Sequence, residues 1–230
     1  MRQYTSKSIL FVTAIALSAC SHLPQTTSQG ATVVSAQTVT QALGVDLASL
    51  EQKATALKSF EYIYNQDHYI AYLSTQPELI KMQKNGQLAK FFYQAGKVSF
   101  VQDKTGVYQF NQSGDLIAAI DVNGKKQYAN PADSKALWHK ASQLQKLFGY
   151  NKADASAGRV KTGSDAKVNY LCIAKIQQVA QTNRVFRSPE NAVVTENQIK
   201  ATVRLNGNQY YNMDCQLSGD KVSKLSLMKK

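Results

Sequence analysis

The sequence predicts an α+β, β-rich fold: an antiparallel up-and-down meander with two packing helices, followed by a C-terminal disulfide-linked β segment. Three observations predict it. Glycines recur about every ten residues between Gly86 and Gly124, the segments between them are rich in β-branched and aromatic residues, and a helical pattern lies on each side. Ten residues are one strand plus one turn, so each glycine is expected in a hairpin turn.

The chain starts like an exported protein. Arg2 and Lys7 precede the run ILFVTAIAL, which is shorter than the roughly 20 apolar residues of a membrane-spanning helix. LSAC follows at residues 17–20 and resembles the lipobox of bacterial lipoprotein precursors. The resemblance implies that residues 1–19 are a lipoprotein signal peptide and that Cys20 carries a covalent lipid. The alternative is an ordinary secretory peptide that contains a cysteine by chance.

The same resemblance implies a location. An acylated cysteine with several chains anchors a protein stably to a membrane. Ser21 is not the aspartate that retains many such lipoproteins in the inner membrane, so a Gram-negative outer membrane is expected, with the protein facing the periplasm. Residues 20–43 are interpreted as the lipidated cysteine and a flexible tether, because residues 21–43 contain no charged side chain. The stretch ATVVSA within them is alternatively an edge strand.

The charge of the chain favours anionic partners. Loss of Arg2 and Lys7 with the signal peptide leaves 25 of the 27 basic residues and all 15 acidic residues, a formal charge of +10. Such a protein is attracted to phospholipid headgroups, lipopolysaccharide or anionic wall polymers. The lysines are scattered, so a merely solvated basic surface is the alternative. Nucleic acid is not an expected partner in this compartment.

Residues 44–150 are expected to form a helix, a β-meander and a second helix. VDLASLEQKATALKSF has helical spacing and Asp46 as its cap. In the meander, Phe92 and Phe91 fall on opposite faces of one strand, so cover is expected on both faces. Asn130, Pro131 and Gly149 then mark the ends of the second helix, on which Trp138 is expected to pack.

Residues 151–167 are small and polar and are predicted to be a linker or loop. Residues 168–230 are predicted to be an antiparallel β segment, either separate or sharing one core with residues 44–150. Cys172 and Cys215 fall on the apolar faces of predicted strands in this segment. Because the periplasm is oxidising, the two cysteines are expected to form a disulfide.

No motif for catalysis or metal binding was found. The sequence has no G-x-S-x-G, S-x-x-K, H-E-x-x-H, EF-hand or phosphate-loop pattern. His68 and His139 are isolated, and the cysteines and histidines have no zinc-ligand spacing. We therefore expect no cofactor other than the lipid on Cys20, no metal and no enzyme activity.

Three functions remain as hypotheses. The first is a non-catalytic envelope lipoprotein that binds an envelope protein or anionic polymer, in scaffolding or assembly. The second follows from element order, since residues 44–150 resemble lipid or lipoprotein carriers of the LolB type. That resemblance implies an acyl-chain cavity lined by five aromatic residues: Phe91, Phe92, Phe100, Phe110 and Trp138. The third is an envelope hydrolase, which requires His68 or His139 to meet a carboxylate or hydroxyl in a cleft.

Overall fold

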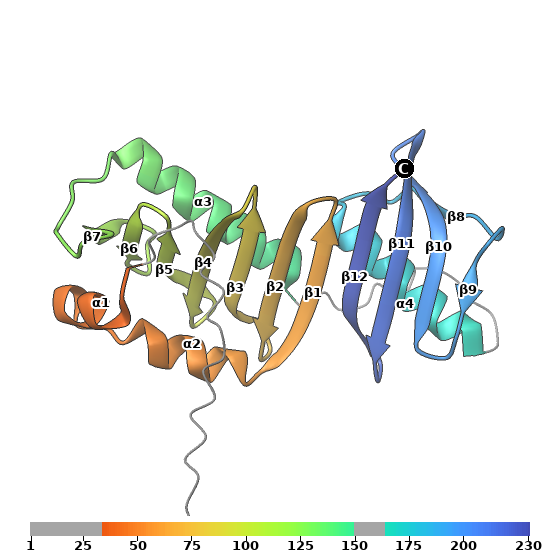
Figure 1. The fold of residues 1–230 in the computed structure, drawn as a ribbon, viewed down its shortest axis with the longest axis horizontal. Coiled ribbons are helices and arrows are strands. Elements are labelled where there is room, and N and C mark those ends of the chain that lie inside the picture. The colour runs from red at the N-terminus through yellow and green to blue at the C-terminus, as the bar shows by residue number, and fades with distance from the viewer. Residues whose placement is uncertain (1–33, 150–163) are drawn as a thin grey trace, which may run out of the picture. The chain divides into compact units, whose positions relative to one another are not determined.

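Twelve strands form one sheet in the computed structural model, which describes residues 34–149 and 164–230. The spatial order is β7-β6-β5-β4-β3-β2-β1-β12-β11-β10-β8, and β9 also pairs with β10 (Figure 1). The strands are β1 Lys58–Tyr64, β2 Asp67–Leu73, β3 Pro77–Lys84, β4 Gln87–Gln94, β5 Lys97–Asp103, β6 Gly106–Phe110, β7 Leu116–Asp121, β8 Val185–Arg187, β9 Val193–Val194, β10 Gln198–Leu205, β11 Gln209–Ser218 and β12 Lys221–Lys229. The helices are α1 Ala36–Leu43, α2 Leu47–Thr55, α3 Pro131–Phe148 and α4 Ser164–Val179.

The predicted antiparallel meander is confirmed. Each of β1 to β6 pairs with the next strand in the chain through an antiparallel ladder, so the meander ends at β7. Tight turns connect them, and in the β4–β5 turn both Ala95 and Gly96 have positive φ angles, of 49° and 74°. A two-residue turn of this conformation matches the twist of the flanking strands, which explains the ten-residue spacing.

The two β segments share one core. β1 pairs with β12 in parallel, with Tyr62 opposite Leu225, and this pairing joins the meander to the C-terminal strands. One buried cluster contains Phe60 and Phe91 from the meander together with Ile199 and Leu227 from the C-terminal segment. Residues 44–149 and 168–230 are therefore parts of one folded unit.

Four helices cover the sheet, two on each face. α3 and α4 pack on one face, here the α3/α4 face, where Ala141, Leu144 and Phe148 of α3 belong to the large cluster. α1 and α2 pack on the opposite α1/α2 face, where Val39 and Leu47 join a smaller cluster. Figure 1 shows α1 and α2 beside the meander strands, on the other side of the sheet from α3.

The two predicted helices are confirmed with their caps, but the first ends at Thr55, and residues 58–60 of its predicted range belong to β1. Asp46 accepts a hydrogen bond from the Ser49 backbone N–H at the start of α2. Asn130 accepts one from the Ala132 N–H at the start of α3, and Gly149 follows its last residue.

The predicted tether is too long. Its last part, from Ala36, forms α1, between Ser35 as N-cap and Gly44, which has φ of 66°. The physical reason is burial, because Val34 and Val39 insert into the smaller cluster although the segment is otherwise polar. The edge strand considered for ATVVSA is not formed by its described residues, Val34 to Ala36. Residues 20–33 lie outside the described residues.

The strand predicted around Cys172 is wrong, because this segment is helix α4. Val168, Cys172, Ile176 and Val179 are all buried, and they follow one another at helical spacing. The helix begins at Ser164, so the predicted linker is shortened at its end, and residues 150–163 lie outside the described residues.

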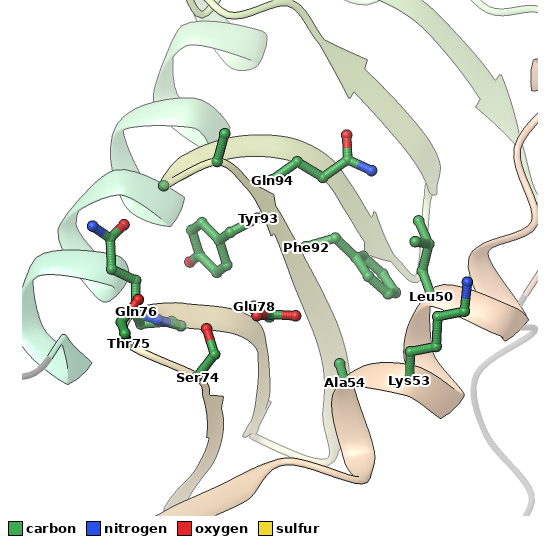
Figure 2. Close-up of a pocket in the computed structure, with 13 residues that line it drawn as sticks. Leu50, Lys53, Ala54, Ser74, Thr75, Gln76, Glu78, Phe92, Tyr93 and Gln94 are labelled. Carbon is green, nitrogen blue, oxygen red and sulfur yellow. The ribbon is translucent and has the colours of Figure 1, made fainter.

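The five aromatic residues assigned to a carrier cavity are divided between the two faces of the sheet. Phe91 and Phe110 are in the large cluster, with Trp138 packed against it, whereas Phe92 and Phe100 are in the smaller cluster. Of the five, Phe92 alone lines the pocket of about 500 Å³ beside α2 (Figure 2). The described part of the chain therefore places these five side chains in two cores and not around one cavity.

Among the described residues, no helix has the length and hydropathy needed to cross a membrane.

Candidate functional site

Part of the sheet has none of the four described helices over one face. On the α1/α2 face, none of these helices packs on strands β1, β12, β11 and β10, and Figure 1 shows no helix in front of β12, β11 and β10. Burial alternates accordingly: in β11, Tyr211, Met213 and Cys215 are buried and point toward α4, while the residues between them are accessible. We call this accessible surface the open face.

A charged cluster lies at the β1–β12 junction of the open face. The Glu61 carboxylate contacts His68 Nε2 at 2.8 Å and Lys224 Nζ at 2.8 Å through different oxygens. Burial raises the pKa of Glu61, but the hydrogen bonds and charges of Lys224 and His68 outweigh it and leave that pKa below its ordinary value. Glu61 is therefore held as an anion that joins three strands.

This cluster meets only part of the requirement of a hydrolase. His68 does contact a carboxylate, but no hydroxyl or thiol of a described residue forms a hydrogen bond to its ring. His139 is exposed on α3 and contacts the edge of the Trp138 ring, with centroids 5.2 Å apart. Within residues 34–149 and 164–230, no group of His, Cys, Asp and Glu is arranged to hold a metal ion.

A second carboxylate of the open face is also paired. Asp214 on β11 accepts a hydrogen bond from Gln198 Nε2 at 2.8 Å, and Lys200 Nζ lies 3.6 Å from its other oxygen. Lys200 and Asp214 are direct partners across β10 and β11. The carboxylates at these two places are thus neutralised within the protein, and the remaining charge is positive.

Four side chains of the types that are enriched in protein interfaces lie together at one end of the open face. Arg204 is opposite Tyr210 on β11 and opposite Phe186 on β8, and its guanidinium carbon is 4.9 Å from the Phe186 ring centroid. Met228 on β12 lies in the adjacent row, opposite Asn212. We call Phe186, Arg204, Tyr210 and Met228 the arginine–aromatic patch.

The large hydrophobic side chains of the patch are exposed. Phe186, Tyr210 and Met228 are 56%, 45% and 42% exposed. No carboxylate of a described residue pairs with Arg204, which instead stacks on Phe186. Aromatic residues, methionine and arginine are enriched in the buried centres of protein interfaces. The four residues stand on paired strands, so the backbone is already ordered before any partner binds.

The residues that the sequence singled out do not form this patch. Cys172 and Cys215 form the predicted disulfide, with Cα atoms 6.1 Å apart, and it is buried on the α3/α4 face of the sheet. Cys20 lies outside the described residues. The sequence contained no signal for the patch, because its four residues come from four strands whose register decides which side chains become neighbours.

A protein of Pasteurella multocida (strain Pm70), described as the uncharacterized protein PM0674, is 97% identical to this chain over 230 residues, which are 100% of both chains. The chain belongs to the family of that protein. No protein-family model matches the chain, and no solved structure matches it.

Proposed function

We propose that the protein is a membrane-anchored, non-catalytic lipoprotein of the bacterial envelope that acts as a binding, scaffolding or assembly module. The anchor is a lipid on Cys20, and the folded unit that begins at Val34 faces the periplasm from the outer membrane. This part of the proposal is supported by the resemblance of residues 17–20 to a lipobox.

The binding part rests on one observation, the exposed arginine–aromatic patch on an uncovered sheet face. Exposed apolar side chains that are grouped, and not scattered, favour a binding surface. Here they flank a guanidinium that has no carboxylate among the described residues. Since the strands are fixed in a sheet, a partner would need to order only the side chains, which lowers the entropy cost of binding.

The chemistry of the surface selects an anionic partner. The mature chain carries a formal charge of +10, which disfavours contact between two copies. A carboxylate that binds Arg204 would make a charge-assisted, two-pronged hydrogen bond, and apolar groups beside it would cover Tyr210 and Met228. We therefore expect an acidic surface of an envelope protein at this patch.

The two alternatives have less support. A carrier of the LolB type requires one acyl-chain cavity, whereas the five aromatic residues expected to line it fill two separate clusters. A hydrolase requires a nucleophile or an activated water near a histidine in a cleft, whereas His68, on β2 beside the open face, pairs with a carboxylate that also contacts Lys224.

Site-specific photo-crosslinking in intact cells tests the binding function. The photoreactive residue replaces Tyr210, or Tyr128 as a matched control, because Tyr128 is also an exposed tyrosine but lies in the connection before α3. We expect a discrete crosslinked product from position 210 that is absent at 128 and disappears with Arg204→Glu. A product that forms equally at both positions, or that persists in Arg204→Glu, would contradict the proposal.

The anchor is tested independently on the processed protein. Mass spectrometry should find an acylated Cys20 at the amino terminus, and Cys20→Ser should release the protein from the membrane fraction. A different cleavage position with a bare amino terminus would show that the lipobox interpretation is wrong, without affecting the test at position 210.

A further inference from the structure

A pocket beside α2 is separate from the arginine–aromatic patch. Its volume is about 500 Å³, within the range of roughly 300–1,000 Å³ typical of small-molecule sites. Three parts of the chain line it: the C-terminal half of α2, the β2–β3 turn and the β4–β5 hairpin (Figure 2). The lining is mixed: six residues have polar side chains, and the others are apolar, aromatic or small, among them Leu50, Ala54 and Phe92.

The polar side chains of the pocket form no hydrogen bonds or ion pairs with described residues. The six are Lys53, Ser74, Thr75, Gln76, Glu78 and Gln94. None of them forms a side-chain hydrogen bond or ion pair with another described residue, in contrast to Glu61 and Asp214 on the open face. Figure 2 shows Ser74, Glu78 and Gln94 around the same space. The described residues therefore leave their hydrogen-bonding groups unused.

The walls that carry these side chains are held in place. The β2–β3 turn is closed by a hydrogen bond of 3.1 Å from the Ser74 backbone N–H to the Gln76 carbonyl. At the β4–β5 turn, Gln145 of α3 donates to the Gly96 carbonyl at 2.7 Å, and the Gln76 side chain lies directly against Gly96. Two turns that are fixed in this way keep the backbone that carries the polar side chains in position before a ligand binds.

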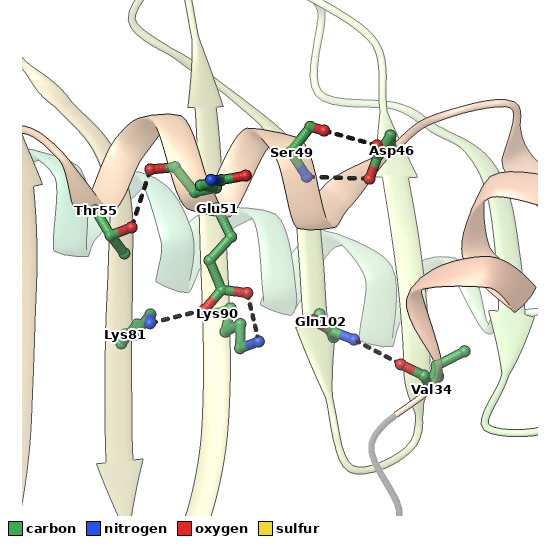
Figure 3. A network of polar contacts seen from close by, with 9 residues as sticks. Val34, Asp46, Ser49, Glu51, Thr55, Lys81, Lys90 and Gln102 are labelled. Carbon is green, nitrogen blue, oxygen red and sulfur yellow. Dashed lines mark hydrogen bonds and ion pairs between the residues drawn. The ribbon is translucent and has the colours of Figure 1, made fainter. Parts of the chain in front are cut away.

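The third wall, α2, is held against the sheet by ion pairs. Figure 3 shows the Glu51 carboxylate of α2 between two lysines of the sheet, Lys81 on β3 and Lys90 on β4. Both ion pairs measure 2.7 Å, and each lysine contacts a different oxygen of Glu51. Since β3 and β4 also carry Glu78 and Gln94, the same contacts set the distance between α2 and the opposite wall of the pocket.

The lining excludes two classes of ligand. An acyl chain needs a mainly apolar enclosure, whereas six of the thirteen residues that line this pocket have polar side chains. A phosphate or polyanion needs an excess of positive charge, whereas Lys53 and Glu78 bring the pocket to neutrality in a chain of net charge +12. The ligand is therefore polar and carries no net charge.

We propose that this pocket binds a neutral saccharide unit of one or two rings. Hydroxyl and primary amide groups both donate and accept hydrogen bonds, so Ser74, Thr75, Gln76 and Gln94 can pair with sugar hydroxyls in either direction. Glu78 accepts from two hydroxyls in charge-assisted hydrogen bonds, and Lys53 donates to a third oxygen. The C–H face of the ring lies against Leu50 and Ala54.

Saturation-transfer NMR and calorimetry on the full chain test this, with the protein in a detergent that contains no sugar. The probes are cellobiose, maltose and di-N-acetylchitobiose, with glycylglycine, inorganic phosphate and palmitate as competitors. We expect at least one disaccharide to bind at about 10 mM or below. Glu78→Ala should weaken that binding by at least about tenfold, because a hydrogen bond to a charged group is lost.

The control is Glu196→Ala, which removes an exposed carboxylate outside the pocket and should leave binding unchanged. Gln94→Ala provides a second pocket variant if Glu78→Ala lowers the thermal stability. Failure of all three disaccharides to bind, binding that is indifferent to both pocket variants, or displacement by glycylglycine, phosphate or palmitate would overturn the proposal. These outcomes are independent of the crosslinking result at position 210.

Discussion

Cys172 on α4 is bonded to Cys215 on β11, so the disulfide joins a helix to the sheet beneath it and does not join two strands. Both residues have no exposed surface, and they lie in the cluster that includes Val168 and Ile176 of the same helix. Because α4 contacts the sheet mainly at β10, β11 and β12, this bond fixes the helix on the C-terminal part of the sheet.

Removal of the disulfide should destabilise the protein strongly. The bond closes a loop with a sequence separation of 43 residues, for which chain entropy gives about 4 kcal/mol. We expect Cys172→Ala/Cys215→Ala to lower the free energy of unfolding by about that amount in urea denaturation. A reducing agent should destabilise the wild type similarly and leave the double variant unchanged. Equal stability of the two proteins without reductant would contradict this expectation.

Two glycines provide a matched test of how Trp138 packs. Gly114 and Gly207 both have φ of 93°, which is strained for any other residue. A Cβ atom at Gly114 would come within 2.6 Å of the Trp138 ring, whereas nothing lies within 4 Å of one at Gly207. Gly114→Ala should therefore be more destabilising than Gly207→Ala by about 1–3 kcal/mol, the usual cost of overpacking.

Fluorescence reports on the same site, because Trp138 is the one tryptophan of the sequence. Its emission maximum should shift in Gly114→Ala and stay unchanged in Gly207→Ala. If both variants lose the same stability with no spectral change, Trp138 does not pack on the β6–β7 turn in solution.

The sequence predicted the meander because local signals are sufficient for it. Turn residues recur at regular spacing, and consecutive strands pair with one another. The segment around Cys172 was misinterpreted because it is ambiguous by pattern: Tyr170, Cys172, Ala174 and Ile176 alternate as in a strand, while Val168, Cys172 and Ile176 repeat as in a helix. The helical set is the buried one.

The rest of the fold depends on contacts between distant residues. α1 has cap signals in Ser35 and Gly44, but its polar composition suggests a tether unless Val39 finds a core to enter. The parallel pairing of β1 with β12 joins residues more than 150 positions apart and leaves no local pattern. The arginine–aromatic patch and the saccharide pocket each combine side chains from several packed elements, so no single sequence motif indicated either.

The ion pairs under α2 predict a dependence of stability on pH. Burial raises the pKa of Glu51, but the hydrogen bonds and charges of Lys81 and Lys90 outweigh it, so the folded-state pKa lies below its ordinary value. A carboxylate whose pKa is lowered on folding stabilises the protein above its unfolded-state pKa and loses this effect as the pH falls through the folded-state pKa.

Glu51→Gln should accordingly lower the free energy of unfolding by about 1–2 kcal/mol at neutral pH, since two lysines lose their partner. The difference from wild type should shrink as the pH falls below about 4, where the wild-type carboxylate also becomes neutral. Denaturation curves at several pH values measure it. A difference that stays constant down to pH about 2 would mean that Glu51 acts through packing alone.

The charge of Lys175 on α4, unlike that of Glu51, should destabilise the folded protein at neutral pH. Its ammonium lies 4.1 Å from the Phe60 ring centroid and donates to Gln178 Oε1 at 3.0 Å, with no carboxylate of a described residue beside it. Burial lowers its pKa from 10.5 to about 8. Below pH 8 both the folded and the unfolded state hold the proton, so the cost of burying the cation is fully present. Between pH 8 and 10.5 the unfolded state binds more protons, and stability rises with pH.

Lys175→Met keeps an unbranched chain that can pack on Phe60 without the charge. We expect it to stabilise the protein at neutral pH by about 1–3 kcal/mol and to lose this advantage as the pH approaches 10.5. Lys135→Met, an exposed lysine on α3, serves as the control and should change stability little across the same range. A destabilised Lys175→Met at neutral pH would show that the contact with Phe60 outweighs the cost of burial.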